Sequence, residues 1–304
     1  MISEGQPSIN MSPPLETPRK SPWPWAPIAW FGALLIAGYF PVLRALAIQW
    51  NDDADMSHGF FVPVVAAFIV WQRREELLAI QPKPNWWGLA LVVWGGLQMW
   101  LGVLAAELFV TRTAFVVTLI GAVWLLCGSQ ILRKLAFPLF LCFFMVPIPA
   151  VIYNSITFPL QLLASRLAEH ALSFFAVPVL RQGNVLVLPN QELSVVEACS
   201  GIRSLLSLTF LSLVYGYFFE KRAWLRVVLF LSTVPIAIVA NGSRVTLTGV
   251  MTQVKPELAE GVFHTASGWV IFMVALVILI CLHLVIVRGC RFVERSEGHG
   301  LSHE

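Results

Sequence analysis

The sequence predicts an all-α integral membrane protein, a polytopic bundle of about eight transmembrane helices with a small extramembrane hairpin before the sixth span. Three observations lead to this fold class. Of 304 residues, 58% are hydrophobic and only 12% are charged, whereas a soluble domain carries about 25% charged residues. Several apolar runs reach the roughly 20 residues that a helix needs to cross a bilayer. Lysine and arginine concentrate in alternate connections between these runs, as the positive-inside rule requires.

The spans follow an N-terminal segment, residues 1–22, whose proline and serine content predicts a disordered cytoplasmic tail. No small-residue cleavage site closely follows the first apolar run, so that run is expected to remain as a span. The transmembrane domain is expected over residues 23–290, and a second cytoplasmic tail over 291–304. The approximate limits of the expected spans are 24–45, 58–72, 86–105, 108–127, 135–153, 200–218, 224–243 and 266–287.

The apolar stretch 154–178 is not counted as a span. It contains three ionisable residues and is apolar on one helical face, which favours an amphipathic helix lying on the membrane surface. After it, turn signals at Gln182-Gly183 and Pro189-Asn190 flank β-branched residues. This pattern predicts a small hairpin or three-strand unit over 178–197.

The distribution of positive charge orients the bundle. With eight spans and the N-terminus inside, 13 of the 20 basic residues fall on inner segments, and every inner segment has some. Both termini are therefore expected in the cytoplasm. If residues 154–178 crossed the membrane, every later segment would be inverted and this agreement would be lost.

This topology brings reactive residues to the outer leaflet on three consecutive spans. Cys199 is expected at the N-terminal end of span six, Asn241 and Arg244 at the C-terminal end of span seven, and His264 at the N-terminal end of span eight. A helix N-terminus and a nearby cation, Arg203 or Arg244, lower the pKa of a thiol. A neutral imidazole exchanges protons, and a guanidinium stabilises an oxyanion. The pattern indicates cysteine-based acyl transfer.

Further residues beside this set are candidates for substrate contact. Glu197 and Arg203 flank Cys199, and Asn241 shares a helix face with Arg244. In the stretch "DADMSHGFFVP", Ser57 is a candidate N-cap of span two, and His58 lies at the same leaflet. Each residue also has a purely structural interpretation, since arginines at span ends commonly extend to lipid headgroups.

The other four cysteines lie within spans or toward the inner side. Cys199 therefore has no expected disulfide partner, and a thiol oxidoreductase would lack its resolving cysteine. A metal site formed by Cys199, His264 and a carboxylate has no repeated ligand spacing to support it. No metal, no cofactor and no nucleic-acid partner is predicted.

Five blocks of the sequence together resemble the exosortase family. They are "SHGFFVP" near span two, "MVPIP" at 145–149, "VVEACSGIRSL" at 195–205, "NGSRV" at 241–245 and "HTASGW" at 264–269. Their order and spacing are similar to those of the family, and the resemblance runs from about residue 30 to 290. The chain departs from members that carry an additional C-terminal domain.

The resemblance implies a cysteine-type peptidase or transpeptidase of the bacterial inner membrane, with its active site facing the periplasm. Such enzymes are thought to cleave membrane-anchored proteins that bear a C-terminal sorting tail, the PEP-CTERM tail: a Pro-Glu-Pro motif, a membrane span and a basic end. By this resemblance Cys199 is the nucleophile that forms an acyl-thioester, and Arg244 and His264 complete the site. The resemblance leaves hydrolysis and transpeptidation both open, as well as the division of roles between Arg244 and His264.

Two other functions remain as alternatives. A polytopic transporter or channel without peptidase activity would show inverted repeats and broken helices at mid-membrane, and the sequence shows no such repeat. A serine protease using Ser200 lacks an assigned base, and full activity of a Cys199→Ser variant would favour it.

Overall fold

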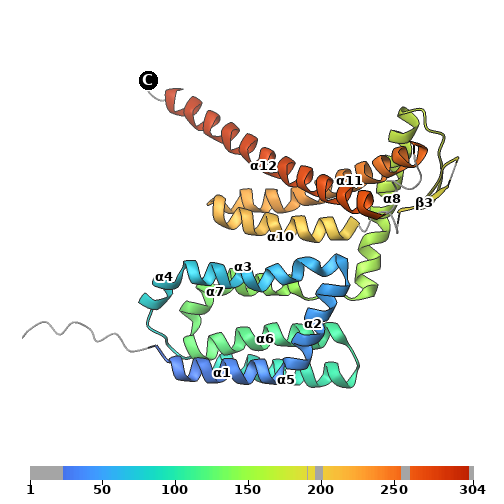
Figure 1. Cartoon of the computed structure of the whole chain (residues 1–304). Helices are drawn as coiled ribbons and strands as arrows, with labels where there is room; N and C mark the ends of the chain where they lie inside the picture. The colour runs from blue at the N-terminus through green and yellow to red at the C-terminus, as the bar shows by residue number, and fades with distance from the viewer. Residues whose placement is uncertain (1–22, 190, 196–200, 255–260, 301–304) are drawn as a thin grey trace, which may run out of the picture.

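The computed structural model describes residues 23–189, 191–195, 201–254 and 261–300, and 83% of the structure is helical. The protein is an all-α polytopic membrane protein. In Figure 1 the helices up to α7 form one group, and α10, α11 and α12 form a second group stacked on it. Helix α8 crosses at the end where the strands lie. The described start of α1 and the C-terminus lie at the opposite end of the molecule.

The first group and the crossing helix α8 together contain ten helical segments. They are α1 (Trp25–Gly38), α2 (Phe40–Asp52), the 3-10 segment η1 (Ala54–Phe60), α3 (Phe61–Gln72), α4 (Arg74–Ala79), α5 (Trp87–Leu104), α6 (Leu108–Cys127), α7 (Ser129–Leu141), the 3-10 segment η2 (Cys142–Met145) and the crossing helix α8 (Ala150–Phe174). The rest of the described chain holds β1 (Leu180–Gln182), β2 (Val185–Val187), β3 (Glu192–Ser194), α10 (Gly201–Phe219), α11 (Ala223–Val254) and α12 (Gly261–Gly300).

The number of uninterrupted spans is smaller than the sequence predicts. Among the described residues, the helices α5, α6, α11 and α12 are long and apolar enough to cross a membrane alone, and up to six spans result if two bent helix pairs count as one span each. The first pair, α1 and α2, bends by 66°. Helix α3 has 12 residues and thus a length of about 18 Å, short of a hydrocarbon core of about 30 Å. By length and composition the described residues thus provide four to six candidate spans against the eight expected, and α11 extends well beyond the expected limit at residue 243.

The chain bends sharply between η2 and α8. The segment Ser129–Met145 and α8 meet at 85°. Two glycines of α11 allow α8 to pack closely across that helix. A Cβ atom on Gly242 would lie 3.1 Å from Cβ of Leu167, and one on Gly249 would lie 3.1 Å from Leu172.

The predicted three-strand unit is confirmed. Strands β1, β2 and β3 form an antiparallel sheet in sequence order, with Arg181 opposite Leu186 and Leu186 opposite Leu193. The turn between β1 and β2 places Gly183 at φ +68°, which glycine adopts without steric cost. Leu186 is completely buried and packs with Ala164 and Ala168 of α8, so the sheet is anchored on the crossing helix.

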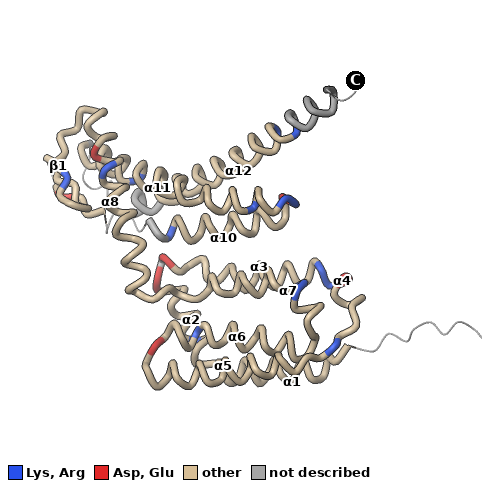
Figure 2. The backbone as a smooth tube through the Cα atoms, turned by 180° about the vertical axis from the view of Figure 1, so that it is seen from behind, with Lys and Arg blue, Asp and Glu red and all other residues tan. Residues whose placement is uncertain are grey.

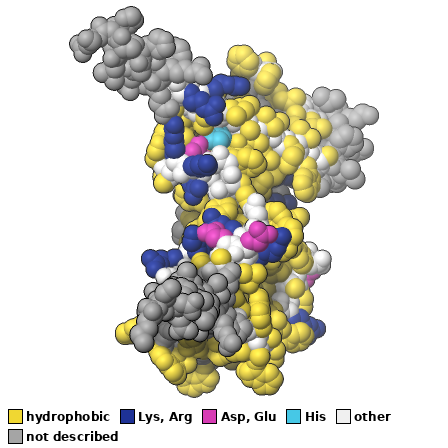
Figure 3. All heavy atoms as spheres, turned by 90° about the vertical axis from the view of Figure 1, so that its left-hand side faces the viewer, with side chains coloured by type: hydrophobic (Ala, Val, Ile, Leu, Met, Phe, Trp, Pro, Cys, Tyr) yellow, Lys and Arg dark blue, Asp and Glu magenta, His cyan; other side chains and the backbone are white. Residues whose placement is uncertain are grey.

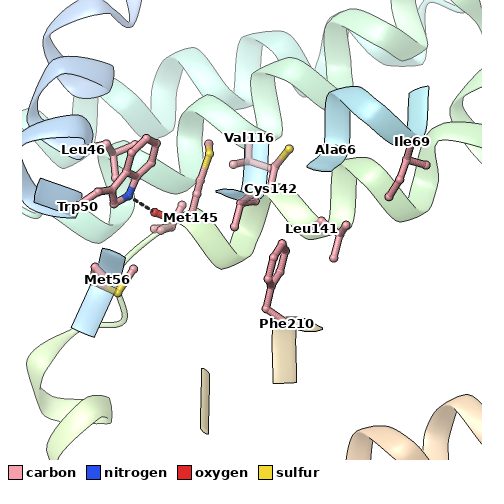
Figure 4. Packing of buried hydrophobic residues seen from close by; sticks show 12 residues of the cluster. Leu46, Trp50, Met56, Ala66, Ile69, Val116, Leu141, Cys142, Met145 and Phe210 are labelled. Carbon is pink, nitrogen blue, oxygen red and sulfur yellow. Dashed lines mark hydrogen bonds between the residues drawn. The ribbon is translucent and has the colours of Figure 1, made fainter. Parts of the chain in front are cut away.

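A core cluster joins the two helix groups near this end of the molecule. Trp50 of α2 donates its indole N–H to the backbone oxygen of Met145 at 3.0 Å, as drawn in Figure 4. Phe210 of α10 points into the same cluster and is 3% exposed. This packing fixes α10 against the segment that leads from α7 to α8.

Basic residues lie at both ends of the bundle and form a denser group at one of them. Figure 2 shows lysine and arginine gathered near α4, α7 and the α10–α11 connection, at the end where α1 begins. Seen from that end in Figure 3, acidic side chains lie among the basic ones. Here Glu76 binds Lys134, and Glu220 accepts a hydrogen bond from His283 at 3.1 Å. Carboxylates of η1 and of the α5–α6 turn lie at the opposite end.

Candidate functional site

The structure describes part of the predicted site. Cys199 and Glu197 lie outside the described residues, and α10 begins at Gly201, two positions after Cys199. His264 is described by its backbone position alone, as the fourth residue of α12. The geometry that follows therefore concerns the residues around these three.

Arg203 forms an ion pair that joins three distant parts of the chain. Its Nε donates to Oδ1 of Asp55 in η1 at 3.0 Å. The hydroxyl of Tyr153, in α8, donates to Oδ2 of the same carboxylate at 2.7 Å. The Asp55 backbone N–H donates in turn to Oδ1 of Asp53 at 2.9 Å. Arg203 is thus held at the start of α10, four residues after Cys199, by a carboxylate that is itself oriented.

Arg244 lies against the helix that carries His264. A Cβ atom on Gly268 would lie 3.0 Å from Cζ and from Nη2 of Arg244. Gly268 follows His264 by four residues, so its position is one helical turn further along α12. The absence of a side chain at residue 268 allows the guanidinium of α11 to reach the backbone of α12. The sequence predicts Arg244 at the C-terminal end of this helix. In the structure α11 continues for ten residues beyond Arg244.

Asn241 points into the protein, as the sequence predicts for a polar pair facing inward. It is 7% exposed and lines a small cavity with Leu160 of α8 and Leu205 of α10. An amide buried among helices needs partners to offset its desolvation. Asn241 therefore belongs to the contact of α8, α10 and α11, one helical turn before Arg244.

His58 is buried in η1, with 7% of its surface exposed and its ring 6.5 Å from that of Phe210. Burial lowers the pKa of His58 below its ordinary value, although the backbone oxygens of Phe144 and Asp55 act in the opposite direction. The imidazole is thereby kept neutral near pH 7. The burial of its ring against α10 favours a role in packing η1 onto that helix.

Ser57 is not the N-cap of the second expected span. It lies within η1, whereas Phe60 occupies the N-cap position of α3 without a capping side-chain hydrogen bond. The side chain of Asp53 caps η1 by accepting from the Asp55 N–H. The 3-10 segment begins earlier than the expected span because the aspartate, not the serine, satisfies its first N–H.

A cavity of about 450 Å³ adjoins the Asp55 network. It lies between the end of α2, η1, the α5–α6 turn, the segment joining η2 to α8, and α10. Its wall includes Asp55, Tyr153 and Leu206, together with Arg112, which is only 6% exposed.

Sequence reasoning missed Asp55, Tyr153 and Arg112 as site residues. Asp55 belongs to the acidic run Asp52, Asp53 and Asp55, and Arg112 lies within the expected span 108–127. An arginine within the apolar run 108–127 is itself a signal, because ionisable residues inside spans are costly and commonly functional. Tyr153 carried no such signal.

Comparison with known proteins assigns the chain to a family. No curated protein and no solved structure matches the chain. A family model described as transmembrane exosortase matches residues 50–281, which include the Asp55 network, Cys199, Arg244 and His264. This family indicates a membrane-embedded sorting protease or transpeptidase in general, acting on membrane-bound proteins with sorting tails. The chain belongs to the transmembrane exosortase family.

Proposed function

We propose that this protein is a cysteine peptidase or transpeptidase that cleaves C-terminal sorting tails of the PEP-CTERM type at the periplasmic face of the inner membrane. Cys199 is the nucleophile, and Arg244 and His264 complete the site. The observation that carries this proposal is the contact of the Arg244 guanidinium with the backbone of α12 at Gly268, one turn from His264. This proximity of a cation of α11 to the helix that carries His264 supports a joint role of the two residues.

The position of Arg203 supports the nucleophilic role of Cys199. The ion pair with Asp55 fixes a cation one helical turn after the cysteine in sequence. A nearby cation favours the thiolate, which is the reactive form of the thiol. The Asp55 carboxylate partly neutralises Arg203 and so reduces its stabilisation of the thiolate. Arg244 is therefore proposed as a second cation for the thiolate.

The chemistry follows acyl transfer. The Cys199 sulfur attacks the carbonyl carbon of the scissile peptide, and Arg244 stabilises the oxyanion with its donor fork. When the C–N bond breaks, the proton lost by the thiol reaches the leaving amine, with His264 as the carrier. The sulfur then holds an acyl-thioester. Attack by water gives a free carboxylate, and attack by a primary amine gives an amide, in each case with return of the thiol.

The proposed orientation rests on charge. Described lysines and arginines gather at the end of the bundle with the start of α1 and the α10–α11 connection, which the positive-inside rule assigns to the cytoplasm. The Asp55 network lies at the other end. Both chain termini are then cytoplasmic, and the site faces the periplasm.

The experiment co-expresses the chain with a reporter that ends in a Pro-Glu-Pro motif, an apolar helix and a basic end. Intact mass of the reporter shows whether the tail is lost and whether water or an amine resolved the thioester. We expect tail loss with wild type and none with Cys199→Ala, while Cys281→Ala, an exposed cysteine of α12, serves as the matched control. Equal tail loss with Cys199→Ala would contradict the proposal, and full activity of Cys199→Ser would transfer the role to a hydroxyl.

A further inference from the structure

The guanidinium of Arg112 opens into the cavity and has no partner among the described residues. Arg112 lies in the second turn of α6, and only 6% of its surface is exposed. Within the described chain it makes no hydrogen bond, and no carboxylate lies within the 4.0 Å of an ion pair. A guanidinium removed from water without an anion is strongly disfavoured. The side chain forms part of the wall of the 450 Å³ cavity.

The acidic side chains of the same cavity already have partners. Asp55 accepts from Arg203 and from Tyr153, and Asp53 accepts from the Asp55 N–H. Glu107 accepts from the Phe109 N–H at 3.4 Å. The group that the cavity lacks is therefore an anion for its arginine.

We infer that this cavity is a binding subsite for a carboxylate side chain of the polypeptide substrate, held by Arg112. The inference rests on the proposed function. A single guanidinium binds one carboxylate through two parallel hydrogen bonds. A phosphate group carries more charge, and three carboxylates in the wall would repel it more strongly than a carboxylate. The remaining wall is largely apolar, with Pro147, Ile148 and Leu206, and suits a short peptide segment.

The place of the cavity connects it to the reaction. Leu206 lies in its wall and follows Cys199 by seven residues, and Arg203 follows Cys199 by four. Both residues lie on α10, which begins at Gly201. A chain bound with its carboxylate on Arg112 would therefore run from the cavity toward the start of α10. Arg112 is thus a specificity-determining residue, not a member of the reacting set.

The test compares two tails with two forms of the enzyme in nanodiscs. The synthetic tails carry either one glutamate before the apolar helix or a glutamine in its place. With the wild type we expect the glutamine tail to be cut about 10- to 100-fold less efficiently, the range for losing a charge-assisted pair. With Arg112→Gln both tails should be cut at the same low efficiency. Arg44→Gln, which changes an exposed arginine of α2 outside the cavity, should behave as wild type.

The substrate substitution keeps the inference testable if Arg112→Gln fails to fold, because it requires no protein variant. Equal cutting of both tails by the wild type would overturn the inference while leaving the proposed function intact. If the wild type cuts neither tail, binding of the two fluorescent tails to Cys199→Ala is measured instead. Stronger binding of the glutamate tail would support the subsite and contradict the proposed peptidase activity. Equal binding of both tails would overturn the subsite. Loss of a co-purified anionic lipid in Arg112→Gln, detected by native mass spectrometry, with unchanged tail selectivity would assign the arginine to lipid and overturn the inference.

Discussion

Replacing Gly268 by alanine tests whether the contact between α11 and α12 positions the proposed catalytic arginine. The added Cβ would lie 3.0 Å from Cζ and from Nη2 of Arg244 and 3.4 Å from its Nε. Comfortable carbon contacts are about 3.5–4.0 Å, so the guanidinium must move by about 0.5–1 Å. A displacement of about 1 Å in a reacting group reduces the rate by up to about 100-fold. We therefore expect kcat/KM for tail cleavage to fall by about 10- to 100-fold, or about 1.4–2.7 kcal/mol.

Stability should change in the opposite direction from activity. The displaced atoms belong to the far end of a flexible side chain, so the backbone need not move. Alanine is a better helix former than glycine by about 1 kcal/mol, which favours the variant fold. Thermal unfolding in detergent should thus show a melting temperature equal to or above that of wild type. Reduced activity in a stable protein is the expected combination.

Gly289→Ala is the matched control, because this residue lies in the same helix and has no atom within 4 Å of the added Cβ. It gains the same helix propensity without touching Arg244. Cleavage by Gly289→Ala should equal that of wild type. Full activity of Gly268→Ala would refute the argument that the α11–α12 contact sets the position of Arg244, and equal losses in both variants would attribute the effect to helix rigidity.

Three further predictions follow from other contacts. Gly88→Ala should destabilise the chain by about 1–3 kcal/mol through overpacking, because its Cβ would lie 2.2 Å from a backbone nitrogen of α6. Gly96→Ala in the same helix meets nothing within 4 Å and should melt at or slightly above the temperature of wild type. Tyr153→Phe removes the hydrogen bond to Asp55, and a charged hydrogen bond contributes about 1.5–3 kcal/mol. We expect kcat/KM to fall by up to about tenfold, with membrane insertion of the protein unchanged. Unchanged kinetics would contradict a role of Asp55 in positioning Arg203. Burial lowers the pKa of His58, so the unfolded chain binds the proton more tightly and stability is lost as the pH falls below about 6.5. His58→Gln should reduce the dependence of the melting temperature on pH between pH 7 and pH 5. An unchanged pH dependence would contradict this prediction.

The predictable part of the fold was the part governed by local composition. Apolar runs identified α5, α6, α11 and α12, and turn residues with β-branched neighbours identified the strands before α10. The bends within the expected spans 24–45 and 135–153 were not predictable, for one reason. Hydropathy reports whether a segment is apolar and carries no information on its direction, so bends of 66° and 85° within apolar sequence were not visible.

The candidate site was likewise predictable where it depends on local sequence and not where it depends on long-range packing. Motif spacing placed Arg244 and His264 on neighbouring helices, and the structure brings Arg244 to the helix of His264. The partner of Arg203 was not predictable, because Asp55 is separated from it by 148 residues. Pairing across that distance depends on the packing of η1 against α10 and not on any local pattern. Arg112 was visible as a charge within a span, but its missing anion is apparent only once burial and neighbours are known.

The "MVPIP" block affects the site through backbone geometry. Proline has no N–H and disfavours helix at the preceding residue, and Val146 accordingly has φ −92° and ψ 121°. The helix that ends at Met145, whose oxygen is held by Trp50, must therefore turn before α8 begins. The 85° bend that results brings Tyr153, in the first turns of α8, within 2.7 Å of Asp55. That carboxylate holds Arg203 in the first turn of α10, so the two prolines help to fix the position of this cation without contributing any reactive group.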